Sequence, residues 1–156
     1  MTWVELVEIL SGTVSSFFFG ILFNMHGKRL WVGTLGGFLS WTAYILFEEL
    51  TGSEVMSYFL VAVFVTVYSE VMARVVKSPT TAFIIASLIP LIPGSSLYYT
   101  MRYALGSNFD LFKSKALSTL ELAAALAIGV IIASAVAKIY FNLLRRYHAR
   151  RAEKRQ

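Results

Sequence analysis

The stretch PTTAFIIASLIPLIPGSSLYYTMRY, residues 79–103, decides the fold of this chain. It is apolar enough to enter a membrane and long enough to cross one, yet Pro90, Pro93 and Gly94 interrupt its middle. Proline removes a backbone donor and clashes with the preceding helical turn. The polar groups that such a break frees are costly in lipid, so irregular backbone persists there only where protein buries it or where it lines a wet cavity. A broken span near the midplane therefore indicates the binding site of a transporter.

The composition of the chain also indicates an integral membrane protein. Of its 156 residues, 57% are hydrophobic and 15% are charged, whereas soluble domains carry about a quarter charged residues. The charges are segregated, which leaves several apolar runs of spanning length. No cysteine is present, so a disulfide framework and thiolate metal sites are excluded. We therefore expect an all-α, polytopic membrane protein embedded in a lipid bilayer, with no metal and no cofactor.

About five transmembrane helices are predicted, and the fourth is the one interrupted at the prolines. Their approximate bounds are residues 3–23, 30–47, 55–73, 80–105 and 117–140. Residues 106–116 form a polar connection. The transmembrane domain covers residues 1–144, and a basic tail, RRYHARRAEKRQ, covers residues 145–156. In a membrane protein such a tail is typical of a solvated segment that touches anionic headgroups, and we expect no nucleic-acid partner.

Lysine and arginine indicate the orientation, because cytoplasmic loops of membrane proteins carry an excess of both. Five spans put the two ends on opposite faces, and the basic tail belongs in the cytoplasm. The N-terminus then lies outside the cell membrane, as does the acidic turn at residues 48–54. Lys113 and Lys115 disagree, since they fall on the outer face. A re-entrant hairpin at the prolines would move them inside but would also move the tail outside, so we keep five spans.

Small residues recur at four-residue spacing in three of the predicted spans, which lets other helices approach closely. In the first span the series is Gly12, Ser16, Gly20 and Asn24. Asn24 either packs with the others or reaches a substrate or coupling ion. Gly33 and Gly37 of the second span have GxxxG spacing, and helix packing is their preferred interpretation. The fifth span carries a third series, at Ala125, Gly129, Ala133 and Ala137.

Glu70 is the unusual polar residue of the third span, because it lies about one helical turn inside Arg74. A carboxylate at that depth is costly unless it is paired, hydrated or protonated. Two interpretations stay open. Glu70 forms a headgroup-level ion pair with Arg74, its i,i+4 neighbour, or it faces the bundle interior and couples protons or substrate to transport.

The break divides the fourth span into two half-helices. The first ends near Leu88 or Ile89, since a residue before proline resists helical dihedrals. The second begins at Gly94, Ser95 and Ser96, with serine as the N-cap, and presents free N–H groups and a partial positive charge near the midplane. Such a helix end favours an anionic group, for example a substrate carboxylate. A packing kink with no ligand is the alternative.

A pattern of motifs extends over nearly the whole chain apart from the basic tail. Glu70 and Pro79 are followed by the proline-glycine break, with Tyr98 after it. Phe23-Asn24 before a short basic loop, and Gly36-Gly37 before Trp41, complete the pattern. The pattern resembles the threonine/serine exporter family, and more narrowly the small, separately encoded subunit of its two-component kind.

The resemblance implies export of small carboxylate-bearing metabolites, either threonine and serine or succinate-like dicarboxylates. It also implies a larger partner subunit and coupling to the proton gradient, a role that would suit Glu70. The expected pathway residues are Asn24, Glu70, Pro90, Pro93, Gly94, Ser95, Ser96 and Tyr98. A homo-oligomeric channel and a non-transporting membrane subunit remain alternatives. We do not expect an enzyme, because the chain has no HExxH or GxSxG motif and its two histidines lie near or beyond span ends.

Overall fold

The computed structural model describes residues 3–106 and 108–153, and this part of the chain is helical with no strand. Side chains are described as far as Leu144 and at Arg146. The elements are α1 (Trp3–Leu22), α2 (Lys28–Thr51), α3 (Glu54–Val76), α4 (Thr80–Leu88), the short 3-10 helix η1 (Ile89–Leu91), α5 (Gly94–Leu105) and α6 (Phe109–Glu153). The prediction of an all-α fold is confirmed.

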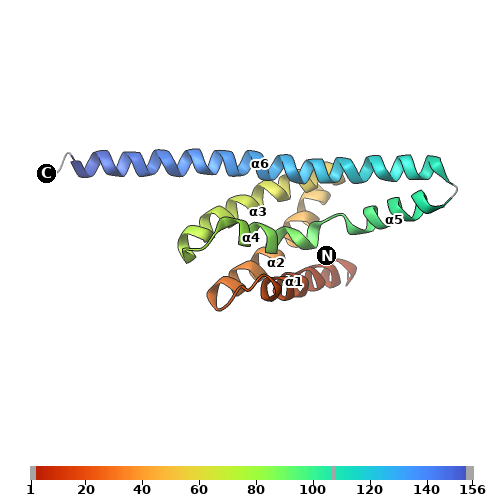
Figure 1. Ribbon diagram of the computed structural model, residues 1–156, viewed down its shortest axis with the longest axis horizontal. Coiled ribbons are helices and arrows are strands. Elements are labelled where there is room, and N and C mark those ends of the chain that lie inside the picture. Colours follow the sequence, from red (N-terminus) through yellow and green to blue (C-terminus); the bar gives the residue numbers. More distant parts are fainter. Residues whose placement is uncertain (1–2, 107, 154–156) are drawn as a thin grey trace.

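Within the described residues, four helices are long and apolar enough to cross a membrane. They are Trp3–Leu22, Lys28–Thr51, Glu54–Val76 and Phe109–Leu144. α4 with η1 and α5 qualify together as a fifth span that is bent by 59° at the break. Figure 1 shows α5 continuing onward from α4 beneath α6, whereas a re-entrant hairpin would turn back toward the start of α4. The interruption of the fourth span is therefore confirmed.

The break follows from the two prolines. α4 ends at Leu88, and η1 tightens the chain around Pro90 before Ile92 adopts an extended conformation with φ −57° and ψ 128°. The carbonyl of Pro93 then accepts the first bond of α5, from the N–H of Leu97 at 3.0 Å. Pro93 thus holds the N-cap position, and no side chain caps this end. The prediction of a serine N-cap was wrong, because the fixed φ of proline starts the helix before the serines are reached.

α6 is longer than predicted at both ends. It has 45 residues, or about 67 Å at 1.5 Å per residue, against about 30 Å for a bilayer core. Its first turn is closed by the N–H of Phe112, which donates to the Asn108 carbonyl, and Phe112 stacks on Phe109. The polar residues 109–116 are therefore helical and not a loop. The basic tail continues the helix to Glu153, and its last residues, 154–156, lie outside the described residues.

α6 runs along the whole molecule and packs against α3 and α5 (Figure 1). Its contact with α3 is made by the small-residue series, in which Ala125, Ala133 and Ala137 are buried. A Cβ added to Gly129 would lie 2.8 Å from the backbone oxygen of Phe59. No larger residue fits there without separating the helices.

α2 contacts α1, α3 and α4. Its glycines make these contacts close: Gly33 lies against Ala86 of α4, and Gly37 lies against Ser16 of α1. Asn24 does not continue the α1 series, because α1 ends at Leu22 and Asn24 takes a left-handed φ of 59° with an exposed side chain. The turn to α2 is made there.

Candidate functional site

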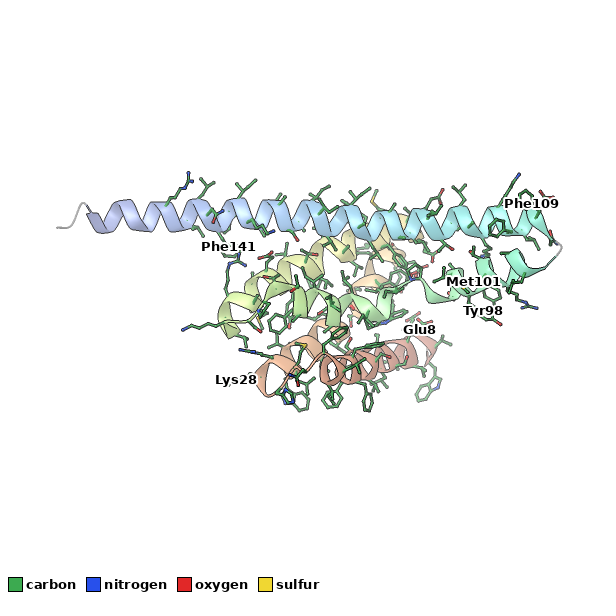
Figure 2. All side chains as sticks on the ribbon, viewed as in Figure 1. Glu8, Lys28, Tyr98, Met101, Phe109 and Phe141 are labelled. Atoms are coloured by element: carbon green, nitrogen blue, oxygen red, sulfur yellow. The ribbon has the colours of Figure 1, made fainter. Side chains whose placement is uncertain are left out.

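Glu70 combines the two environments that its sequence position suggested. Its side chain is buried, with a relative exposure of the residue of 3%, and its Oε2 accepts a bond of 2.6 Å from Nη1 of Arg74. Nη1 also donates to the backbone oxygen of Glu70. The Arg74 guanidinium lies 3.6 Å from the ring centroid of Phe141, which Figure 2 places in the C-terminal half of α6. The ion pair lies within α3, and the contact of Arg74 with the Phe141 ring ties α3 to α6.

A cleft of about 380 Å³ lies beside this ion pair. It is formed where the end of α3, the start of α4 and the middle of α6 meet. Its lining residues are Glu70, Arg74, Pro79, Thr80, Thr81, Ile84, Ser134 and Lys138.

The chemistry of the cleft suits a small zwitterion. Thr80 and Thr81 form the first turn of α4, where backbone N–H groups lack intrahelical partners and the helix dipole is positive. Pro79 occupies the N-cap of α4 and supplies no side-chain cap. Lys138 adds a second cation, so the cleft carries one carboxylate, two cations and the hydroxyls of two threonines and Ser134.

An apolar groove of about 290 Å³ adjoins the cleft between α3 and α6. Glu70 lines both spaces, and the rest of the groove is lined mainly by valines, Ile132 and the rings of Tyr140 and Phe141. On one side Glu70 therefore faces ions and hydroxyls, and on the other it faces hydrocarbon. A carboxylate in this position depends on its partner for stabilisation of its charge.

Several residues of the cleft, among them Thr80, Thr81 and Ser134, were missed by the sequence analysis. A signal was present in α6. Ser134 and Lys138 are four residues apart and each follows a buried member of the small series, Ala133 or Ala137, so they lie together next to the side of α6 that faces α3. Which helix they would face could not be inferred from local pattern alone.

The residues of the break lie elsewhere. Pro93 is buried, but Gly94 and Ser95 are exposed, and Tyr98 is 61% exposed and points away from α6 in Figure 2. None of the break residues is among those that line the described cleft. The structure thus places Glu70 beside the start of the fourth span. The sequence analysis had grouped Glu70 with residues from the middle of that span as one expected pathway. Contact between the break and substrate stays a prediction.

The comparisons with known proteins bear on the class of the chain. A family described as Threonine/Serine exporter, ThrE, matches residues 8–136. No curated protein and no solved structure matches the chain. The matched range contains α1 from residue 8 onward, all of α2 to α5, α6 as far as residue 136, and every residue of the cleft except Lys138. The chain therefore belongs to the threonine/serine exporter family.

Proposed function

We propose that this chain is a membrane subunit of a secondary exporter whose substrates, threonine and serine, bind in the cleft between α3, α4 and α6. Membership of the family supports the transport of these amino acids. The observation that carries the assignment of the site is the convergence of the Glu70–Arg74 pair, the start of α4 and Lys138 on one cleft of about 380 Å³. A free amino acid presents a carboxylate, an ammonium group and a small side chain, and the cleft offers a counterpart to each.

The binding mode follows from the charges. The substrate carboxylate lies on the N-terminal amides of α4 and on Lys138, since both favour an anion. The ammonium group lies toward Glu70, and the side-chain hydroxyl reaches Thr81 or Ser134. A succinate-like dicarboxylate would bring its second carboxylate against Glu70, where like charges repel. We therefore rank amino acids above dicarboxylates as substrates.

Proton coupling is proposed at Glu70. The substrate ammonium and a proton compete for the same carboxylate, because a protonated Glu70 no longer attracts a cation. A proton that arrives from outside would then release the amino acid, and departure of the proton would restore the pair with Arg74. One proton moves inward for each zwitterion that moves outward, which is antiport.

The orientation proposed is N-terminus outside and C-terminus in the cytoplasm of the cell membrane. It puts the cleft at the cytoplasmic end of the bundle, because the turn between α3 and α4 borders the cleft. An exporter captures its substrate on this side.

A larger subunit of the same family is the partner that we propose for transport, in the two-component arrangement. Support comes from α5, all of which the structure describes: none of its 12 residues is buried, and its main contact is α6. Leu97, Met101 and Leu105 remain exposed on it. A homo-oligomer that forms a channel is the second candidate, because a second copy could cover the same helix.

The test is efflux of labelled serine from proteoliposomes that contain this chain with its larger partner. In Lys138→Gln we expect the KM for serine to rise about tenfold, which corresponds to about 1.4 kcal/mol, the loss of one charge-assisted bond to the carboxylate. The matched control is Lys113→Gln, which removes an equal charge from the same helix away from the cleft. An unchanged KM in Lys138→Gln would remove the cleft from the pathway. Flux of this chain alone would favour the homo-oligomer.

A further inference from the structure

We propose that the transport path continues from the cleft into a layer of buried hydroxyl groups at the middle of the bundle, closed in this structure, which takes up water and the transported amino acid. This inference rests on the proposed function of the cleft. It assigns a second position to the substrate, away from the break that the sequence singled out.

The first observation is a set of buried polar atoms without hydrogen-bond partners. In the part of the chain that the structure describes, they are Ser16 Oγ, Trp41 Nε1, Thr66 Oγ1, Ser69 Oγ and Ser87 Oγ. Four of the five are hydroxyls, from α1, α3 and α4, and the fifth is the indole N–H of Trp41 in α2. Buried polar groups in native proteins are nearly always hydrogen-bonded, and an unpaired one points to a water molecule, an ion or a functional strain.

Other hydroxyls in these helices behave differently. Thr34 donates to the carbonyl of Leu30, and Ser40 donates to that of Gly37, as side chains of this type ordinarily do inside a helix. A hydroxyl that makes no such bond and faces no polar neighbour adds a desolvation cost without stabilising the fold. Alanine would fill the same position at a lower cost, as Ala86 does beside Ser87 in α4.

The second observation is the position of the layer relative to the cleft. Thr66 lies four residues before Glu70 in α3, and Ser87 lies three residues after Ile84 in α4. Glu70 and Ile84 both line the cleft. Because α3 and α4 are joined by a short turn and pack together, these steps lead in the same direction, one helical turn into the bundle.

The third observation is how tightly the layer is closed. A Cβ added to Gly36 would overlap the side chain of Ser87 and lie 3.1 Å from the ring of Tyr68. A Cβ added to Gly37 would overlap the side chain of Ser16. Because Gly36 and Gly37 have no side chains, α1 and α4 pack directly against the backbone of α2.

The chemistry of the layer matches the proposed cargo. A hydroxyl both donates and accepts hydrogen bonds, so an uncharged hydroxyl lining serves the carboxylate, the ammonium group and the side-chain hydroxyl of serine or threonine alike. It also holds no fixed charge that would trap a zwitterion. We infer that the layer separates the cleft from the opposite face when closed and is filled when the helices part.

The absence of cysteine from the chain makes the test direct. Ser87→Cys, Thr66→Cys and the control Ala86→Cys are made one at a time in the full chain, which is reconstituted with its larger partner. Ala86 is as fully buried as Ser87 on the same helix, but it belongs to the apolar cluster with Phe83. The probe is a small, positively charged methanethiosulfonate, which reacts with the hydrated thiolate.

We expect Ser87→Cys and Thr66→Cys to react with the reagent at least about tenfold faster than Ala86→Cys. Saturating serine should lower the reaction rates of both variants, because it occupies the same space. Thr66→Cys decides the result if Ser87→Cys does not fold. Rates as slow as that of Ala86→Cys, in variants that still transport serine, would overturn the inference. Fast labelling without any serine flux would support the hydrated layer and contradict the proposed function, so the two failures are distinct.

Discussion

At the scale of single residues, Glu70 carries most of the proposed chemistry. Its carboxylate is held by one guanidinium, and Arg74 itself is partly exposed, with 40% of its side chain accessible. The pair is therefore asymmetric: the acid is inside and the base borders the cleft. A buried carboxylate with one exchangeable partner can give up that partner for a proton or for a substrate cation, and this exchange is what coupling requires.

Glu70→Gln tests this role. We expect serine export driven by a pH gradient to fall at least about tenfold, because glutamine keeps the size of the side chain but cannot exchange a proton. The measurement is efflux from proteoliposomes with and without an imposed gradient, at equal protein levels. Glu121→Gln is the control, since Glu121 is exposed on α6 and lies outside the cleft. Gradient-driven export that persists at the parent rate in Glu70→Gln would assign coupling to another residue.

At the scale of the helices, small residues decide how closely the elements approach. Gly129 is the tightest example on α6, since its α-carbon faces the backbone of α3 at Phe59. Gly94, at the start of α5, has open space around it. The two glycines therefore predict opposite outcomes for the same substitution.

We expect Gly129→Ala to destabilise the protein by about 1–3 kcal/mol, because the added methyl group forces α3 and α6 apart and the backbone cannot yield. This cost exceeds the intrinsic helical preference of alanine over glycine, about 1 kcal/mol. Gly94→Ala should leave stability unchanged or raise it slightly. Unfolding followed by circular dichroism in detergent measures both. Equal stability of the two variants would mean that α6 does not lie on α3 at this position.

How much of this arrangement the sequence predicts depends on whether the cause is local. The break was predictable because prolines act on their own turn, and the end of α4 at Leu88 follows the same rule. The early start of α6 could not be predicted, because the polar residues of its first turns are typical of a loop. The stacking of Phe109 on Phe112, which accompanies the helical first turn, is seen only in the structure. The cleft could not be predicted from the sequence either, because it depends on which turn of α6 lies against the start of α4.

At the scale of the whole molecule, α6 packs on α3 but, together with α5, forms a helical hairpin that extends beyond the bundle. Figure 1 shows the hairpin extending past α1 to α4, and the hydroxyls of Thr100 and Thr119 meet within it at 3.1 Å. If the bundle spans the bilayer in five passes, the tip of the hairpin lies at the outer face.

Topology is tested by single cysteines in the cysteine-free chain. We expect Lys113→Cys, near the tip of the hairpin, to react in intact cells with a reagent that does not cross membranes. Lys28→Cys, at the start of α2, should react only after permeabilisation, because the proposed orientation puts it on the cytoplasmic side. Both lysines are exposed, which makes the pair a matched control. Protection of Lys113→Cys in intact cells would indicate that α4 and α5 form a re-entrant loop, which would put the basic tail outside.

The unbroken length of α6 has a mechanical consequence. Each residue of an α-helix turns the chain by about 100°, so the directions of all its side chains are fixed relative to one another. The contact with α5 at Thr119 and the small-residue series that faces α3 are therefore held at a fixed angle to each other around the helix axis. Deleting a single residue between Thr119 and Leu122 would leave each part intact and misalign it with the next. Because α6 is one continuous helix, a rotation imposed on its C-terminal end also rotates the N-terminal end that contacts α5.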